Sequence, residues 1–117
     1  MRTPLPNRRK AITSKVKAQN RSVFIGVGLT ADNKLGELFI DASKCGSTLQ
    51  SVFASWATLI SVQLQMEVTW ADIMASQKDF IYSDASGIML AVFTEVSAIE
   101  ADLQFEANEA EVRGNRT

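Results

Sequence analysis

The sequence predicts a two-layer α+β domain, in which a three-stranded antiparallel meander is packed by two main helices and a short linking helix. Before residue 42, polar and apolar side chains alternate, which is the period of a strand with one buried face. After residue 47, apolar side chains recur every three or four positions, which is the period of an amphipathic helix. At 117 residues the chain is long enough for a single domain with its own core.

Three strands are expected in the first part of the chain. Residues 12–18 place small or apolar side chains on one face and polar ones on the other, and residues 22–29 repeat the alternation more strongly. A turn follows, and residues 35–41 complete the meander. Gly26 and Gly28 share one face of the second strand, where they leave room for a ligand, a helix or another backbone, or mark a bulge.

Two helices are expected next. Ser47, followed three residues later by Gln50, fits a capping box and predicts the start of a long helix that ends near Glu67. Thr69 has the position of an N-cap for a short helix through about Gln77. The apolar stripe of the long helix, expected to face the core, comprises Leu49, Val52, Phe53, Trp56, Leu59, Ile60 and Leu64.

A connector over residues 79–83 is expected to lead to the last helix, which begins at Asp84 or Ser86 and frays beyond Phe105. The core-facing stripe of that helix comprises Ile88, Val92, Val96, Ile99 and Leu103. These elements predict three segments: a flexible basic arm over residues 1–10, a single domain over residues 11–105 and a polar tail over residues 106–117.

The composition argues against catalysis. The chain contains no histidine and a single cysteine, Cys45, which excludes Ser–His and Cys–His nucleophile pairs, a zinc site and an intrachain disulfide. Asp32, Glu37 and Asp41 are near one another, but their spacing marks no working pair of carboxylates. We expect no metal and no other cofactor. The single cysteine, the lack of a bilayer-length apolar run and the lack of a secretory signal predict a cytoplasmic protein without membrane contact.

Charge is unevenly distributed along the chain. The charged residues before Asp32 are all basic, namely Arg2, Arg8, Arg9, Lys10, Lys15, Lys17 and Arg21. The stretch from Glu95 to Glu111 is acidic. A basic arm of this kind binds the phosphate groups of a nucleotide or of nucleic acid, or is simply solvated.

Three segments carry a family resemblance: GELFI at residues 36–40, KCGSTL at residues 44–49 and ISVQLQ at residues 60–65. With Arg8-Arg9 ahead of the first strand, they resemble the TSCPD domain, found near the C-terminus of adenosylcobalamin-dependent ribonucleotide reductases and as short standalone proteins. The likeness spans residues 8–66. It departs at Ser14, at or next to the position of a histidine common in the family, and the Thr-Ser-Cys-Pro-Asp string is missing. It implies a fold and a link to nucleotide-handling proteins, but not ribonucleotide reduction.

The start of the long helix is the best candidate site. Free backbone N–H groups, the helix dipole, one cation and two hydroxyls favour a phosphate there, although an ordinary capped helix start has similar residues. Basic residues before and within the first strand are the nearest further cations in the sequence. The expected ligand-binding residues are therefore Arg8, Arg9, Lys15, Lys44, Gly46, Ser47 and Thr48.

Four further residues have two interpretations each. Cys45 is expected to be a small packing residue and not a reactive thiol, although it lies just ahead of the helix. Trp70, Phe80 and Tyr82 lie off the strong stripes and are expected to pack beneath the connector, with base stacking or a subunit interface as the alternative.

The sequence thus favours a non-catalytic, homo-oligomeric module that binds a nucleotide or another phosphate-bearing small molecule and is accessory to nucleotide metabolism. The homo-oligomer follows from a thin sheet whose open face and edges need cover. Two alternatives stand beside it. One is a phage-type sponge that sequesters nucleotide immune signals, and the other is a nucleic-acid-binding or assembly protein that uses the basic arm.

Overall fold

The three-stranded antiparallel meander predicted from the sequence is confirmed. A computed structural model describes residues 10–18, 20–83 and 87–114. The strands are β1 (Ala11–Ala18), β2 (Arg21–Leu29) and β3 (Leu35–Asp41), and they lie in the order β1-β2-β3. A short 3-10 helix, η1 (Ser43–Cys45), precedes α1 (Ser47–Gln65), α2 (Trp70–Ser83) and α3 (Ile88–Gly114).

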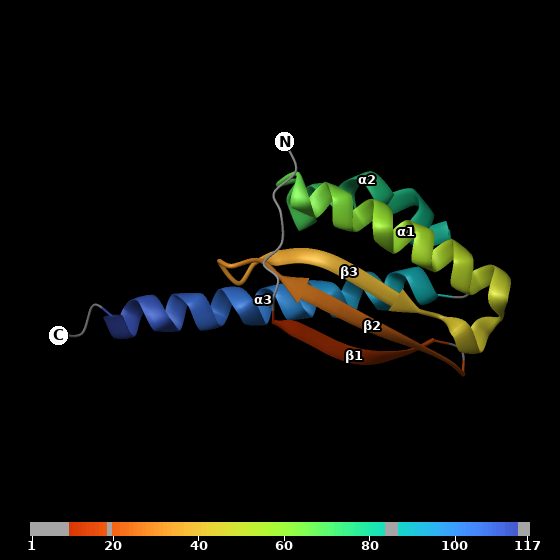
Figure 1. The fold of residues 1–117 in the computed structure, drawn as a ribbon, viewed down its shortest axis with the longest axis horizontal. Helices are drawn as coiled ribbons and strands as arrows, with labels where there is room; N and C mark the ends of the chain where they lie inside the picture. Colours follow the sequence, from red (N-terminus) through yellow and green to blue (C-terminus); the bar gives the residue numbers. More distant parts are fainter. Residues whose placement is uncertain (1–9, 19, 84–86, 115–117) are drawn as a thin grey trace.

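The helices form the second layer on one face of the sheet. The sheet buries the alternate residues of β2, from Val23 to Leu29, together with Leu38 and Ile40 of β3. α1 packs along β3, while α3 packs along β1 and β2. In Figure 1, α3 runs along the sheet and then continues well past its end, which gives the molecule a long axis of 53 Å. The other face of the sheet carries no helix in the part of the chain that the structure describes.

The outer edge of β3 is protected by α1. The Leu38 N–H donates a hydrogen bond to Ser61 Oγ at 2.9 Å. The Ser61 hydroxyl lies 3.1 Å from Leu38 O and 2.8 Å from Ala57 O, and donates its one proton to either. Because an unpaired strand edge is a template for unwanted pairing, this hydroxyl both satisfies the backbone and blocks the edge.

The capping box predicted at the start of α1 is wrong. The N-cap is Gly46, with φ 103° and ψ 158°, and no side chain caps the helix. Glycine adopts this positive φ without the steric cost that a Cβ brings. The Gln50 side chain instead accepts a hydrogen bond from the Ala42 N–H at 2.6 Å, which ties η1 to α1. The helix ends at Gln65, and Glu67 follows with φ 67°.

α2 is longer than predicted, and the connector expected over residues 79–83 is wrong. Thr69 does act as predicted, because its Oγ1 accepts a hydrogen bond from the Asp72 N–H at 3.1 Å. Beyond Gln77, however, the helix continues to Ser83. The buried residues Trp70, Ile73 and Ile81 lie on one helical face, but half-buried Gln77 interrupts that stripe and hides it in the sequence.

α3 is also longer than predicted. Its described start is Ile88, and the expected starts at Asp84 and Ser86 lie outside the described residues. The expected fraying beyond Phe105 is wrong, because the helix continues to Gly114. Its final turns are rich in glutamate and alanine, which favour helix, and Arg113 pairs with Glu109 four residues earlier at 3.3 Å. The boundaries drawn at residues 10 and 105 stay a prediction.

Candidate functional site

The residues predicted at the helix start lie together on the surface between β3 and α1. Lys44, Gly46, Ser47 and Thr48 are all exposed. Cys45, between them, is half-buried and packs against the core, which agrees with a packing role. Arg8 and Arg9 lie outside the described residues.

Lys15 and Lys44 converge on the same aromatic ring. Lys15 is directly opposite Phe24 in the pairing of β1 with β2, and its Nζ lies 5.8 Å from the centre of the Phe24 ring. The Nζ of Lys44, which arrives from η1, lies 5.4 Å from the same centre. Both distances are within the range of a cation–π contact. The fold therefore unites two predicted ligand-binding residues that are 29 positions apart in the chain (44 − 15).

Phe24 belongs to a surface that we call the open face, the side of the sheet turned away from the helices. Its residues form three rows across the strands. The first row contains Lys15, Phe24 and Asp41, the second Thr13, Gly26 and Phe39, and the third Ala11, Gly28 and Glu37. Phe24 is 41% exposed and Phe39 is 59% exposed. Large exposed aromatics on a strand face are typical of a binding surface.

The two glycines of the open face differ in the space above them. A Cβ at Gly26 would lie 3.7 Å from Phe39 Cβ, which is ordinary van der Waals contact. A Cβ at Gly28 would collide with the Glu37 side chain, whose Cγ would be 2.6 Å away. Because Gly28 has no Cβ, the buried Glu37 side chain can lie across the strand at this position. The close packing coincides with the irregularity in the strand register between Gly28 and Leu29. Gly26 adds no side chain between Phe24 and Phe39, and the Phe39 ring leans over it, with Cδ2 3.8 Å from the place that a Cβ would occupy.

Asp41 carries a stable negative charge beside the lysines. Its side chain accepts hydrogen bonds from Ser43, including one from the Ser43 N–H at 3.0 Å. These bonds, with a smaller contribution from the charge of Lys44, lower the pKa of Asp41 below its ordinary value. The carboxylate thus fixes the turn that delivers Lys44 to the open face.

The carboxylates do not form a catalytic pair. Glu37 and Asp41 share a face of β3 but are four residues apart, roughly 13 Å along a strand. This spacing exceeds the reach over which two carboxyl groups act on one bond. Among the described residues, no group of three or more Asp, Glu or Cys side chains is placed to hold a metal ion.

The off-stripe aromatics divide into two kinds. Trp70 is buried, stacks on Phe93 with ring centres 4.9 Å apart, and donates from Nε1 to Ser97 Oγ at 2.9 Å. Its expected packing role is confirmed. Phe80 and Tyr82 are 63% and 71% exposed on α2, so the expectation that they pack beneath a connector is wrong.

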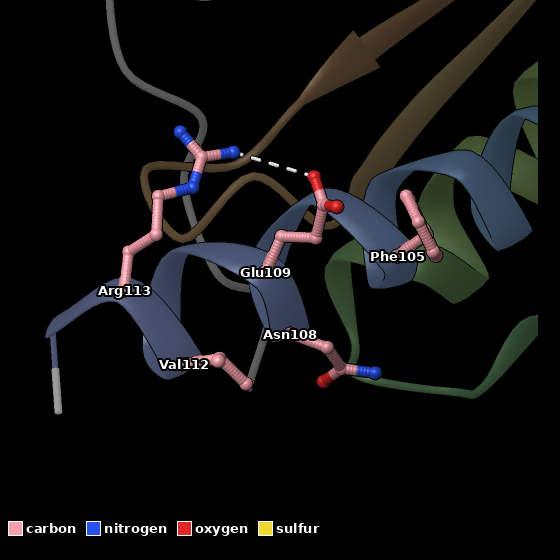
Figure 2. A pocket seen from close by; sticks show the side chains of 5 residues that line it. All are labelled: Phe105, Asn108, Glu109, Val112 and Arg113. Carbon is pink, nitrogen blue, oxygen red and sulfur yellow. Dashed lines mark hydrogen bonds and ion pairs between the residues drawn. The ribbon is translucent and has the colours of Figure 1, made fainter. Parts of the chain in front are cut away.

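Two hollows lie on the helical layer. The larger, of about 560 Å³, is lined by residues of α1, α2 and the starts of β2 and α3, including Trp56, Phe80 and Arg21. The buried Nε1 of Trp56 has no hydrogen-bond partner among the described residues. The smaller, of about 280 Å³, lies along the projecting end of α3 and is shown in Figure 2. All five of its lining residues come from this one helix, so it is a helix surface and not an enclosed site.

In the part of the chain that the structure describes, no helix combines the length and the apolar character needed to cross a bilayer.

The comparisons with known proteins agree with the resemblance stated from the sequence. Over 67 residues, the chain is 37% identical to the vitamin B12-dependent ribonucleotide reductase of Bradyrhizobium diazoefficiens and 36% identical to that of Agrobacterium fabrum. It is 34% identical to the corresponding reductase of Rhodopirellula baltica. The matched stretch is 57% of this chain but only 5–6% of each reductase. No family model matches the chain, and no solved structure matches it.

The chain is therefore a relative of a short segment of these reductases, and the predicted relationship is confirmed. Phe24 and Phe39, which join the candidate site in the structure, were not predicted from the sequence. The signal was present in the alternation of β2 and β3. Phe24 has the same parity as Gly26, and Phe39 falls between the core residues Leu38 and Ile40, so both rings had to lie on the open face.

Proposed function

We propose that this chain is a non-catalytic module that binds a nucleotide or another phosphate-bearing small molecule on its open face, as an accessory to nucleotide metabolism. The observation that carries the proposal is the convergence of Lys15 and Lys44 on Phe24. The relationship to a segment of ribonucleotide reductases supports the link to nucleotides.

Lys15 and Lys44 supply charge-assisted contacts that a helix start alone lacks. The dipole of a helix start alone stabilises a bound anion by about 0.3–1 kcal/mol, which is too little for useful affinity. Each charge-assisted hydrogen bond adds roughly 1.5–3 kcal/mol. Lys44 lies two residues before Gly46, the N-cap of α1, and in this proposal one phosphate bridges the lysine and the helix start.

In this proposal the basic residues ahead of β1 act on a second copy of the chain. Lys10, where the described arm ends, lies five residues from Lys15 along β1, roughly 16 Å for a strand. Lys10 therefore lies at the end of the sheet opposite Lys44. We propose that Arg8 and Arg9 complete the site of a neighbouring subunit in a homo-oligomer.

Several exposed apolar side chains support assembly. On α1, Val52 and Leu59 are 57% and 62% exposed, although the sequence pattern predicted both in the core. On the projecting end of α3, Phe105 and Val112 lie seven residues apart on one face (Figure 2). Because apolar side chains gathered on a helix face mark interaction surfaces, a second copy is the simplest cover for them.

The absence of histidine and the separation of Glu37 from Asp41 support binding without turnover. A module of this kind holds its ligand unchanged. We expect incubation with ribonucleoside triphosphates to leave them intact, as chromatography of the mixture would show.

The proposal is tested by native mass spectrometry and calorimetry. Protein purified from cells is expected to show an oligomer with a retained phosphate-bearing molecule, whose mass also separates a metabolic nucleotide from a signalling one. Lys15→Ala and Lys44→Ala are each expected to weaken ATP binding about 10- to 100-fold, since each removes a charge-assisted contact. Lys34→Ala is the matched control, because Lys34 is an exposed lysine in the β2–β3 turn. Equal affinity in all three variants would place the ligand elsewhere.

A further inference from the structure

We infer that the open face is a stacking platform for a single nucleobase, held between Phe24 and Phe39 above Gly26, with the phosphates of the same ligand directed to Lys15 and Lys44. The inference rests on the proposed function and narrows the ligand to a nucleoside phosphate. Inorganic phosphate and sugar phosphates would engage the lysines alone.

The two rings are diagonal neighbours. Phe24 is paired with Asp41, and Phe39 lies two residues from Asp41 on the same face. Diagonal positions across a strand pair are about 7–8 Å apart, and strand side chains stand roughly perpendicular to the sheet. A flat ring in contact with two others needs about twice the carbon–carbon contact distance of 3.5–4.0 Å. The spacing of the two positions therefore suits one aromatic ring.

Gly26 supplies the floor of this slot. It lies in the row of Phe39 and two residues from Phe24, with its α-carbon facing the same side. Phe39 Cδ2 lies only 3.8 Å from the place that a Cβ at Gly26 would occupy. The Phe39 ring thus leans over Gly26, and a base enters the slot as this ring turns aside, since glycine adds no side chain between the rings.

Charge gives the ligand a direction. Both cations lie at the Phe24 end of the slot, where their Nζ atoms are 5.4 and 5.8 Å from the ring centre. The start of α1 follows Lys44 at the same end. At the other end, the third row carries the buried Glu37, and the exposed Lys10 lies next to it, just ahead of β1. The Phe24 end thus holds two lysines against one carboxylate, Asp41, whereas the other end holds one lysine and Glu37, so a base in the slot places its phosphates over Phe24, toward Lys15 and Lys44.

The test measures a panel of ligands by calorimetry: the four ribonucleoside triphosphates, inorganic triphosphate and a short oligoribonucleotide. Triphosphates that carry a base are expected to bind about 5- to 150-fold more tightly than inorganic triphosphate, which is the range that stacking of one base contributes. Phe39→Leu is expected to remove that advantage while leaving inorganic triphosphate unaffected. Phe80→Leu is the matched control, because Phe80 is equally exposed on α2.

Gly26→Ala is the second variant, and its fold is preserved because the added methyl group meets Phe39 at ordinary contact distance. It is expected to weaken nucleotide binding with unchanged circular dichroism. Equal affinity of inorganic triphosphate and nucleotides, with both variants normal, would overturn the platform and leave the lysine site standing. Tighter binding of the oligonucleotide than of any mononucleotide would overturn the ligand class. If no ligand of the panel binds, the platform and the proposed function both fail.

Discussion

Replacing Gly28 with alanine should destabilise the protein through one collision. The new methyl group would lie 2.6 Å from Glu37 Cγ and 2.9 Å from Glu37 Cδ. Glu37 is buried, so its stem has little room to withdraw. Overpacking of this kind costs typically 1–3 kcal/mol. A glycine-to-alanine change also stabilises by about 0.4–1 kcal/mol, because it reduces the entropy of the unfolded chain.

Gly26→Ala isolates the collision from this entropic effect. Gly26 is two residues away on the same strand and face, and its added methyl group has ordinary contacts of 3.7 and 3.8 Å with Phe39. Both variants share the change in the unfolded state, so the difference between their unfolding free energies reports the collision. We expect Gly28→Ala to be less stable than Gly26→Ala by about 1–3 kcal/mol.

The assay is urea unfolding followed by circular dichroism, at one fixed protein concentration because assembly shifts apparent stability. Glu37→Ala in the background of Gly28→Ala removes the colliding group. The double variant should therefore lose less unfolding free energy than the sum of the losses of the two single variants. Equal stability of Gly28→Ala and Gly26→Ala would refute the packing of Glu37 across Gly28.

Two further perturbations test the helical layer. Ser61→Ala should cost about 1–3 kcal/mol in unfolding free energy, because it leaves the part-buried Leu38 N–H without its partner at the edge of β3; no change in urea unfolding would mean that water replaces the hydroxyl. Glu100→Gln should stabilise the protein at neutral pH, because burial raises the pKa of Glu100 above its ordinary value of 4.5. The folded state then binds the proton more tightly than the unfolded state, so stability falls as pH rises from 4.5 through the raised pKa. The gap between the glutamine variant and the parent should therefore vanish well below pH 4, where Glu100 of the parent is protonated in both the folded and the unfolded state. A gap that persists there would rule out ionisation as its cause.

The sequence determined the sheet in full because its signal is local. Alternation with a period of two sets which side chains of β2 and β3 face the core, and the turn residues between them set the order of the strands. The predicted stripe of α3, from Ile88 to Ile99, is likewise buried as expected. In these elements, which face a residue occupies depends on the residues next to it in the chain, so the local sequence pattern is sufficient to predict its burial.

The lengths and exposed faces of the helices were decided by tertiary packing. Val52 and Leu59 fit the apolar period of α1 yet lie exposed, because β3 and η1 contact only one side of that helix. α2 continues past Gln77 because Ile81 finds a place in the core. A window of sequence contains the period of a stripe but not the width of the surface that will cover it.

The candidate site shows the same division. The sequence determined which residues are candidates for the site, since Lys15, Lys44 and the helix start could all be named from residue type and spacing. Only the tertiary structure decided their partner, because the pairing of β1 with β2 and the turn through η1 bring both lysines over Phe24. The physical reason is that a binding surface gathers side chains from distant positions, and their distances are set by strand register and chain reversal, which act across the fold and not along the chain.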